Sequence, residues 1–291
     1  MLQSRLCKSV VWMTIGAAGI TVVAARAQEQ VAAPSGPAPI LVTVREMVKP
    51  GEEDIHAKLE ARYAAALNAA KASQYYLGMG AITGSPQTVF LSGYASLQEM
   101  SDVHDYDEVN FGDQLDSLAS DHGKSLSGMD TAIWRLRPEL CNPDVVTLGK
   151  MRFMELIHIH VKLGHSVDFL DVTTRIREAW MRADPNFHYA IYQQIYGGST
   201  DDSYLVMVAM KSLADLDKHN SLLAEFQKSL GEEAQRHIRE VESAEYNSTE
   251  SNLFVFTPSM SRLPESWTKG DQDFWNPKLP AAPVKKPATA K

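Results

Sequence analysis

The sequence predicts an α+β fold in which one unit, strand–helix–strand–strand–helix–strand, occurs twice in tandem. The first observation is that segments with strand-type and helix-type periodicity alternate in the same order in both halves of the chain. The second is that punctuating residues recur at similar offsets. Gly51 and Gly164 each end a first strand and lie 113 residues apart, and Pro138 and Pro258 each halt a last strand and lie 120 apart.

Periodicity defines the elements of the first half. Alternating β-prone residues predict strands, and apolar residues three and four positions apart predict helices. Ser96 and Glu99 form a capping box, which begins the second helix. In order, the first half is expected to contain a strand over 40–48, a helix over 55–70, strands over 75–82 and 88–94, a helix from Ser96, and a strand over 131–136.

The second half shows the same pattern with little sequence identity to the first. Ser166 is a capping residue that begins its first helix, and Asp184-Pro185-Asn186 ends that helix. Gly197-Gly198 marks a turn between two strands. In order, we expect a strand over 153–161, a helix over 166–183, strands over 188–196 and 204–210, a helical region over 212–241, and a strand over 252–257.

This order of elements resembles the dimeric α/β-barrel superfamily, in which two ferredoxin-like sheets pack face to face. Members include antibiotic-biosynthesis-type monooxygenases, NIPSNAP-like proteins and several haem-handling enzymes. The resemblance covers Ile40 to about Pro258 and brings no catalytic motif. It implies a pseudo-dimeric α/β barrel built by one chain, with ferredoxin-like repeats over 40–142 and 143–261 and a C-terminal extension and tail over 262–291.

The first 27 residues predict a cleavable secretory signal peptide. Arg5 and Lys8 precede an uncharged apolar stretch, 10–25, which is shorter than the roughly 20 residues that span a bilayer. Ala25-Arg26-Ala27 supplies a cleavage site before Gln28. We therefore expect a periplasmic or secreted protein with a Pro-rich spacer over 28–39, and an uncleaved anchor is the alternative.

Composition limits the partners and the redox chemistry. Without the signal the chain has 25 basic and 36 acidic residues, a net charge of −11, which argues against nucleic acid or an anionic membrane as the main partner. Cys141 is then the one cysteine, so no intramolecular disulfide is possible. The oligomeric state stays open. The basic, Pro-rich tail over 276–291 is predicted to be disordered.

A candidate binding site follows from strand alternation. His158 and His160 share one strand face, and the offset of 113 places Arg45 at the position that corresponds to His158. If the polar faces point between the sheets, they form a lining that suits a small polar or anionic ligand. The candidate ligand-binding residues are Arg45, Arg135, His158, His160, His188 and Tyr192.

Metal and haem are alternatives to this interpretation. His158 and His160 are spaced as two metal ligands on a strand, but the sequence has no second such pair, so we predict hydrogen-bonded lining residues and no metal site. In haem-handling relatives a histidine reaches the iron, which makes His104 and His219 candidates. No C-x-x-C-H attachment motif is present, and the cofactor is left open.

Two functional hypotheses remain. In the first, the protein binds a small molecule, or acts as a monooxygenase-like enzyme, in the cavity between the sheets. In the second, it is a non-catalytic interaction module whose interior is filled by Met47, Trp134, Met154 and Phe254. Whether the protein is an enzyme is left open, because a fold of this kind hosts many chemistries. The volume left free inside the barrel distinguishes the two.

Overall fold

The structure is a computed structural model that describes residues 36–142, 148–198 and 201–276, with the backbone alone over 113–122. The predicted signal peptide, most of the Pro-rich spacer and the tail from residue 277 lie outside the described residues. Among the described residues, no helix has the length and apolar character needed to cross a membrane.

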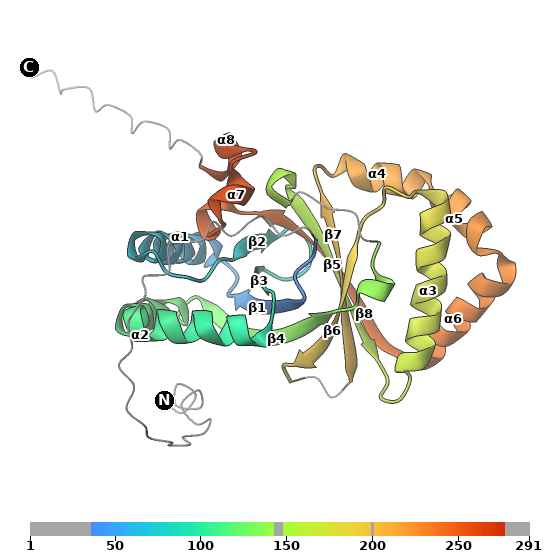
Figure 1. Ribbon diagram of the computed structural model, residues 1–291, viewed down its shortest axis with the longest axis horizontal. Helices are drawn as coiled ribbons and strands as arrows, with labels where there is room; N and C mark the ends of the chain where they lie inside the picture. The colour runs from blue at the N-terminus through green and yellow to red at the C-terminus, as the bar shows by residue number, and fades with distance from the viewer. Residues whose placement is uncertain (1–35, 143–147, 199–200, 277–291) are drawn as a thin grey trace, which may run out of the picture. The chain divides into compact units, whose positions relative to one another are not determined.

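The described strands close into an eight-stranded antiparallel barrel in the order β1-β3-β2-β8-β5-β7-β6-β4 (Figure 1). This confirms an α+β fold with helices packed around a sheet. The strands are β1 (Ile40–Val48), β2 (Leu77–Ala81), β3 (Gln87–Tyr94), β4 (Leu126–Leu136), β5 (Phe153–Val161), β6 (Ala190–Tyr196), β7 (Asp202–Met210) and β8 (Tyr246–Phe256).

The strand order is the same in the two halves of the chain. The first four strands lie in the order β4-β1-β3-β2 and the last four in the order β8-β5-β7-β6, and the pairs β2–β8 and β4–β6 join them. The registers also agree. Glu46 of β1 lies opposite Thr88 of β3, and Ile159 of β5, 113 residues later, lies opposite Tyr204 of β7.

The helices pack on the outer surface of the barrel. Helices α1 (Glu53–Ala70) and α2 (Leu97–His122) lie side by side, and α3 (Ser166–Ala183) packs against α5 (Leu223–Leu230) and α6 (Glu232–Glu245) (Figure 1). α1 and α3 have 18 residues each and begin 113 residues apart. Each helix buries one stripe against the sheet. The stripe of α3 is mostly apolar, as in an amphipathic helix, whereas that of α1 includes His56 and Glu60.

Turn and cap chemistry explains several boundaries. Gly51 and Gly164 have φ of 88° and 89°, a backbone conformation that glycine adopts without a Cβ clash, so each strand turns into its helix at the same point. The predicted capping box forms in part: the Glu99 N–H donates to Ser96 Oγ at 3.1 Å, whereas the Glu99 carboxylate accepts from the N–H of Ala95, one residue before the cap, at 2.5 Å.

The interior of the barrel is filled by apolar side chains from all eight strands. They include Leu41, Met79, Leu91, Trp134, Leu156, Tyr192, Leu205 and Phe254. Three of the four residues expected to fill it, Trp134, Met154 and Phe254, are buried there. Because strand side chains alternate, a second set packs outward beneath the helices, around Leu67 on one side and Phe169 on the other.

The C-terminal extension closes one end of the barrel. Trp275 of α8 (Gln272–Trp275) joins the interior cluster, and its Nε1 donates to the Gly149 carbonyl at 2.8 Å. Arg152 pairs with Asp271 and lies 3.7 Å above the centre of the Phe274 ring. Phe274 and Trp275 therefore dock the extension onto the body.

Two strands are longer than periodicity predicts. β4 begins at Leu126 and β8 at Tyr246, about five residues before the predicted starts. These early segments are exposed, and main-chain pairing with β1 and β5 makes them strands. Apolar alternation therefore carries no signal there. The predicted helical region over 212–241 is three helices, α4 (Ala214–Ser221), α5 and α6, of which the last two meet at Gly231 with φ 80°.

Candidate functional site

One mouth of the barrel carries a polar group above the apolar interior. Leu41 and Leu156 point inward, so Arg45 and His158, an even number of residues further along β1 and β5, point inward as well. His160 follows on the same face. The predicted set Arg45, His158 and His160 therefore meets inside the barrel.

The two histidines form a compact group with Trp134. The ring centres of His158 and His160 are 4.1 Å apart, and the ring of Trp134 meets His158 edge-on at 5.3 Å. Nδ1 of His160 is hydrogen-bonded to Ser203 Oγ at 3.1 Å and lies 3.8 Å from the Asp201 carboxylate. These contacts hold the rings in fixed positions.

His158 is neutral at physiological pH. Burial, with smaller contributions from His160 and Arg45, lowers the pKa of His158 from 6.5 to about 4. Its Nε2 is buried and has no hydrogen-bond partner among the described residues. A buried polar atom without a partner costs about 1–3 kcal/mol. A ligand that donates to or accepts from Nε2 would offset this cost.

Arg45 supplies positive charge beside these rings. Its side chain is 20% exposed, and its ionic partner among the described residues is Glu250, 57% exposed, with 4.0 Å between Nη1 and Oε2. A hollow of about 390 Å³ opens on the side of Arg45 that faces the turn between β2 and β3. Its lining includes Arg45, Met47, Gly84, Gln87, Glu250 and Asn252, but not the two histidine rings. The guanidinium is thus held at a mouth that a small solute can reach.

The other predicted residues lie elsewhere. Tyr192 is buried in the interior cluster, where burial raises its pKa and its hydroxyl donates to the Ala38 carbonyl at 3.0 Å. His188 is half-buried two residues before β6 begins. Arg135 follows the inward-facing Trp134 and lines a separate hollow of about 600 Å³ with Pro39 and Leu97. The inward polar face expected around Arg135 is therefore not formed, because the indole fills the interior instead.

Sequence reasoning missed three contributors to this mouth: Glu250, Ser203 and Thr43. Glu250 lies in the polar start of β8, opposite His158, where apolar alternation offers no strand signal. Ser203 lies opposite His160 on β7. The hydroxyl of Thr43 accepts from the Trp134 indole. Only the pairing of strands distant in the sequence brings them to the histidines.

The two histidines considered for haem have different surroundings. His104 is exposed on α2. The His219 ring is stacked against Trp180 and packs on Phe187, with 4.2 Å between ring centres in each case. Burial lowers the pKa of His219. Haem stays a hypothesis, since neither residue lies at the barrel mouth.

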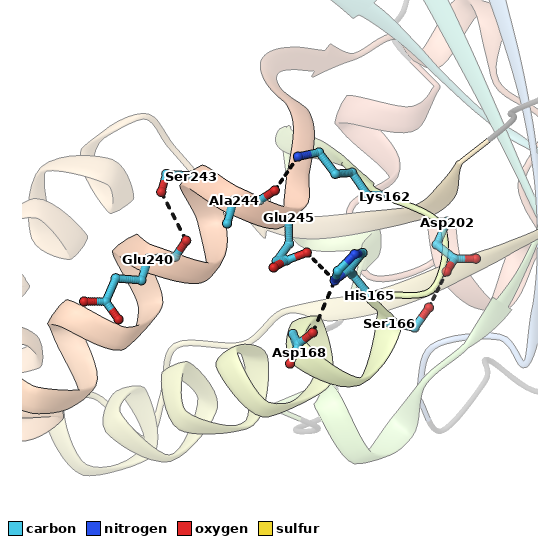
Figure 2. Close-up of polar contacts among 9 residues, drawn as sticks. All are labelled: Lys162, His165, Ser166, Asp168, Asp202, Glu240, Ser243, Ala244 and Glu245. Carbon is cyan, nitrogen blue, oxygen red and sulfur yellow. Dashed lines mark hydrogen bonds and ion pairs between the residues drawn. The ribbon is translucent and has the colours of Figure 1, made fainter.

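A second group of polar side chains lies on the outer surface, at the start of α3. Figure 2 shows the His165 ring between the carboxylates of Asp168 and Glu245, while Lys162 contacts the Ala244 carbonyl. Ser166 binds Asp202 nearby. His165, Asp168 and Glu245 are all partly exposed. These contacts fasten the end of α6 to the start of α3.

Comparison with known proteins supports the fold alone. No protein-family model and no curated protein matches the chain. An anthrone oxidase-like protein superposes with a TM-score of 0.53 at 9% identity, over 77% of this chain and 92% of that one. A candidate monooxygenase from Fusobacterium nucleatum subsp. nucleatum gives 0.50 at 11% identity, over 76% and 93%.

A chlorite dismutase from Candidatus Nitrospira defluvii superposes with a TM-score of 0.44 at 12% identity, over 80% of this chain and 95% of that one. All three solved structures are far below the identity at which function is shared. The chain is therefore similar in fold to the anthrone oxidase-like protein and to the candidate monooxygenase.

Proposed function

We propose that this protein is an exported binding protein that takes a small carboxylate at the barrel mouth, with Arg45 as its anchor. The observation that carries the proposal is the burial of the Arg45 side chain together with its long ionic contact. It is four-fifths buried, yet its ionic partner among the described residues is an exposed carboxylate at 4.0 Å. A ligand carboxylate can replace Glu250 with the shorter, bidentate pairing that arginine favours.

The residues around Arg45 suit the rest of such a ligand. Nε2 of His158 offers one further hydrogen bond, and the edge-on rings of Trp134 and His158 offer an aromatic wall. Neutral His158 leaves Arg45 as the main positive charge at the mouth. We therefore expect an anion with a small apolar or aromatic body to bind better than an inorganic ion.

Two further parts of the proposal concern the whole chain. The identical strand order of the two halves supports a pseudo-dimeric barrel of two tandem ferredoxin-like repeats in one chain. The charged, apolar and small-residue regions of 1–27 support export and cleavage. The mass of the protein recovered from the exported fraction tests the second part, with a chain beginning at Gln28 as the expected result.

A non-catalytic interaction module is the second candidate, because the interior below the mouth is filled by side chains from all eight strands. Under this alternative, replacing His158 and His160 together with alanine would mainly lower stability. Under the binding proposal, the same double variant stays folded and loses its ligand.

The proposal is tested by titrating the mature protein with benzoate and with its uncharged isostere benzamide. Imidazole NMR signals of His158 and His160 report binding. We expect benzoate to shift them saturably and benzamide to leave them unchanged. Arg45→Gln should abolish the benzoate response, whereas Arg135→Gln, an arginine outside the mouth, should retain it.

Equal responses to the two probes, or an unchanged response in Arg45→Gln, would refute the anion site. A complementary observation is native purification from the exported fraction, followed by mass spectrometry and an absorption spectrum. A co-purifying carboxylate supports the site. A Soret band would instead favour the haem alternative.

A further inference from the structure

Three ligand-type side chains are buried together between β1 and α1, outside the barrel mouth. Glu46, His56 and Glu60 are 7%, 2% and 4% exposed. One donor atom from each lies within 4.8 Å of the other two. Nε2 of His56 is 3.3 Å from Glu46 Oε2 and 3.1 Å from Thr88 Oγ1.

Burying two carboxylates at one point requires positive charge. An ionised group in the interior is tolerated when it is paired or bound to a metal. A single imidazolium supplies one charge for two carboxylates.

One pair of donor atoms has the separation expected between two ligands of a metal ion. Two ligand atoms that each lie about 2.0–2.1 Å from a tetrahedral zinc are about 3.3–3.4 Å apart. The 3.3 Å between His56 Nε2 and Glu46 Oε2 has this value. One imidazole with two carboxylates is a donor set for first-row divalent metals such as Zn²⁺.

An independent observation points to a ligand at the same place. Tyr76 is 6% exposed, and its hydroxyl is buried with no hydrogen-bond partner among the described residues. Tyr76 packs in one buried cluster with Ala64 of α1, which lies one turn after Glu60, and with Phe90 of β3. A bound ion or its water would give the hydroxyl a partner.

The other half of the barrel shows that the fold does not need polar residues here. The positions that correspond by register and by the 113-residue helix offset carry Ile159, Phe169, Thr173 and Tyr204. Phe169 and Tyr204 are fully buried and stacked with 3.8 Å between ring centres. One half thus fills this layer with aromatic rings, whereas the other fills it with two carboxylates and an imidazole.

From these observations we propose that Glu46, His56 and Glu60 bind one divalent transition-metal ion, with Zn²⁺ as the fitting example, between β1 and α1. The two carboxylates neutralise the ion and the imidazole completes a three-residue set. The ion ties the start of α1 to β1 and stabilises the first half of the chain. The site is separate from the Arg45 mouth, because Glu46 and Arg45 are adjacent on β1 and face opposite sides of the sheet.

The test is metal uptake by the mature, chelator-treated protein. We expect Zn²⁺ to bind at one ion per chain by calorimetry, to raise the thermal unfolding midpoint, and Co²⁺ to give a visible absorption band. Glu60→Gln keeps the shape of the side chain and removes its charge. It should weaken binding by more than about 100-fold, since even indirect partners of a metal account for 10–100-fold.

The matched control is Glu245→Gln in the partly exposed group at His165, which also combines one histidine with two carboxylates (Figure 2). Its metal uptake should equal that of the wild type. A second variant copies the other half, with Glu46→Ile, His56→Phe, Glu60→Thr and Thr88→Tyr. It should unfold cooperatively and take up no metal.

Several results would overturn the proposal. The wild-type protein could fail to take up Zn²⁺ or Co²⁺ stoichiometrically. The Glu60→Gln variant could still take up metal, or the Glu245→Gln variant could lose it. The wild type and the two Gln variants are sufficient to test metal binding at this site, whether or not the quadruple variant folds.

Discussion

The indole nitrogen of Trp134 on β4 donates a 2.9 Å hydrogen bond to Thr43 Oγ1 on the neighbouring strand β1, inside the barrel. Both residues are buried. The bond satisfies a polar atom within an apolar interior and orients the ring whose edge meets His158. Trp134 therefore lies where the apolar interior of the barrel meets its polar mouth.

Thr43→Val is expected to destabilise the protein by about 1–3 kcal/mol, because it keeps the shape of the side chain and leaves the Trp134 N–H without an acceptor. Urea unfolding measures the free energy. Thr249→Val, at an exposed position of β8, is the control and should change it by less than about 0.5 kcal/mol. Equal effects of the two substitutions would contradict the role of this bond.

The pKa of His158 predicts a stability change in mild acid. Because burial lowers this pKa from 6.5 to about 4, the unfolded chain gains a proton between these pH values while the folded chain does not. The free energy of unfolding should therefore fall as pH decreases from about 6.5 to 4, by on the order of 2–3 kcal/mol, and then level off.

His158→Gln removes this contribution, so its difference from the wild type should depend on pH over that window and be constant above it. NMR titration of the imidazole gives the pKa directly. A His158 midpoint near 6.5 would show that the ring is not desolvated as the structure has it.

The Phe169–Tyr204 stack is expected to stabilise the second half of the chain. Phe169 is 1% exposed, and its ring centre is 3.8 Å from that of Tyr204. Phe169→Ala should cost about 3–5 kcal/mol through the cavity it leaves. Val167→Ala, on the same helix but 74% exposed, is the control and should be nearly neutral in the same thermal and urea measurements.

Gly78 and Gly80 on β2 should differ sharply in their tolerance of a side chain. A Cβ at Gly78 would lie 2.3 Å from the Met260 carbonyl oxygen, whereas one at Gly80 would meet only Thr257 Oγ1 at 3.8 Å. Gly78→Ala must displace the segment after β8 and should lower the unfolding midpoint by several degrees. Gly80→Ala should leave the midpoint nearly unchanged, and a similar loss in both would argue against this close packing.

Much of the architecture could be predicted from local pattern. β1, β5 and α3 have the bounds that periodicity and turn residues predict. Each has a regular apolar pattern, of strand type in β1 and β5 and of helix type in α3, and turn residues lie at its ends. The polar starts of β4 and β8 could not be predicted. Their conformation comes from main-chain pairing with β1 and β5, not from their own side chains.

The candidate site was predictable in part for the same reason. Alternation placed His158 and His160 on one face, and the repeat offset added Arg45. Glu250 and Trp134 join them only through strand pairing and barrel closure, which a linear pattern does not show. The buried group at Glu46 escaped notice because one glutamate lies on a strand and the other, with the histidine, on a helix.

The sequence by itself determined most of the segments that form strands and helices, their repeated order, and the signal-peptide pattern on which the export prediction rests. These properties depend on residues within a few positions of each other, where turn chemistry and side-chain periodicity act. The tertiary structure decided which strand faces look into the barrel and which polar groups meet there. Closure of the eight strands into a barrel fixes which face of each strand points inward. The apolar side chains of all the strands can be buried together only if their apolar faces all point to the inside.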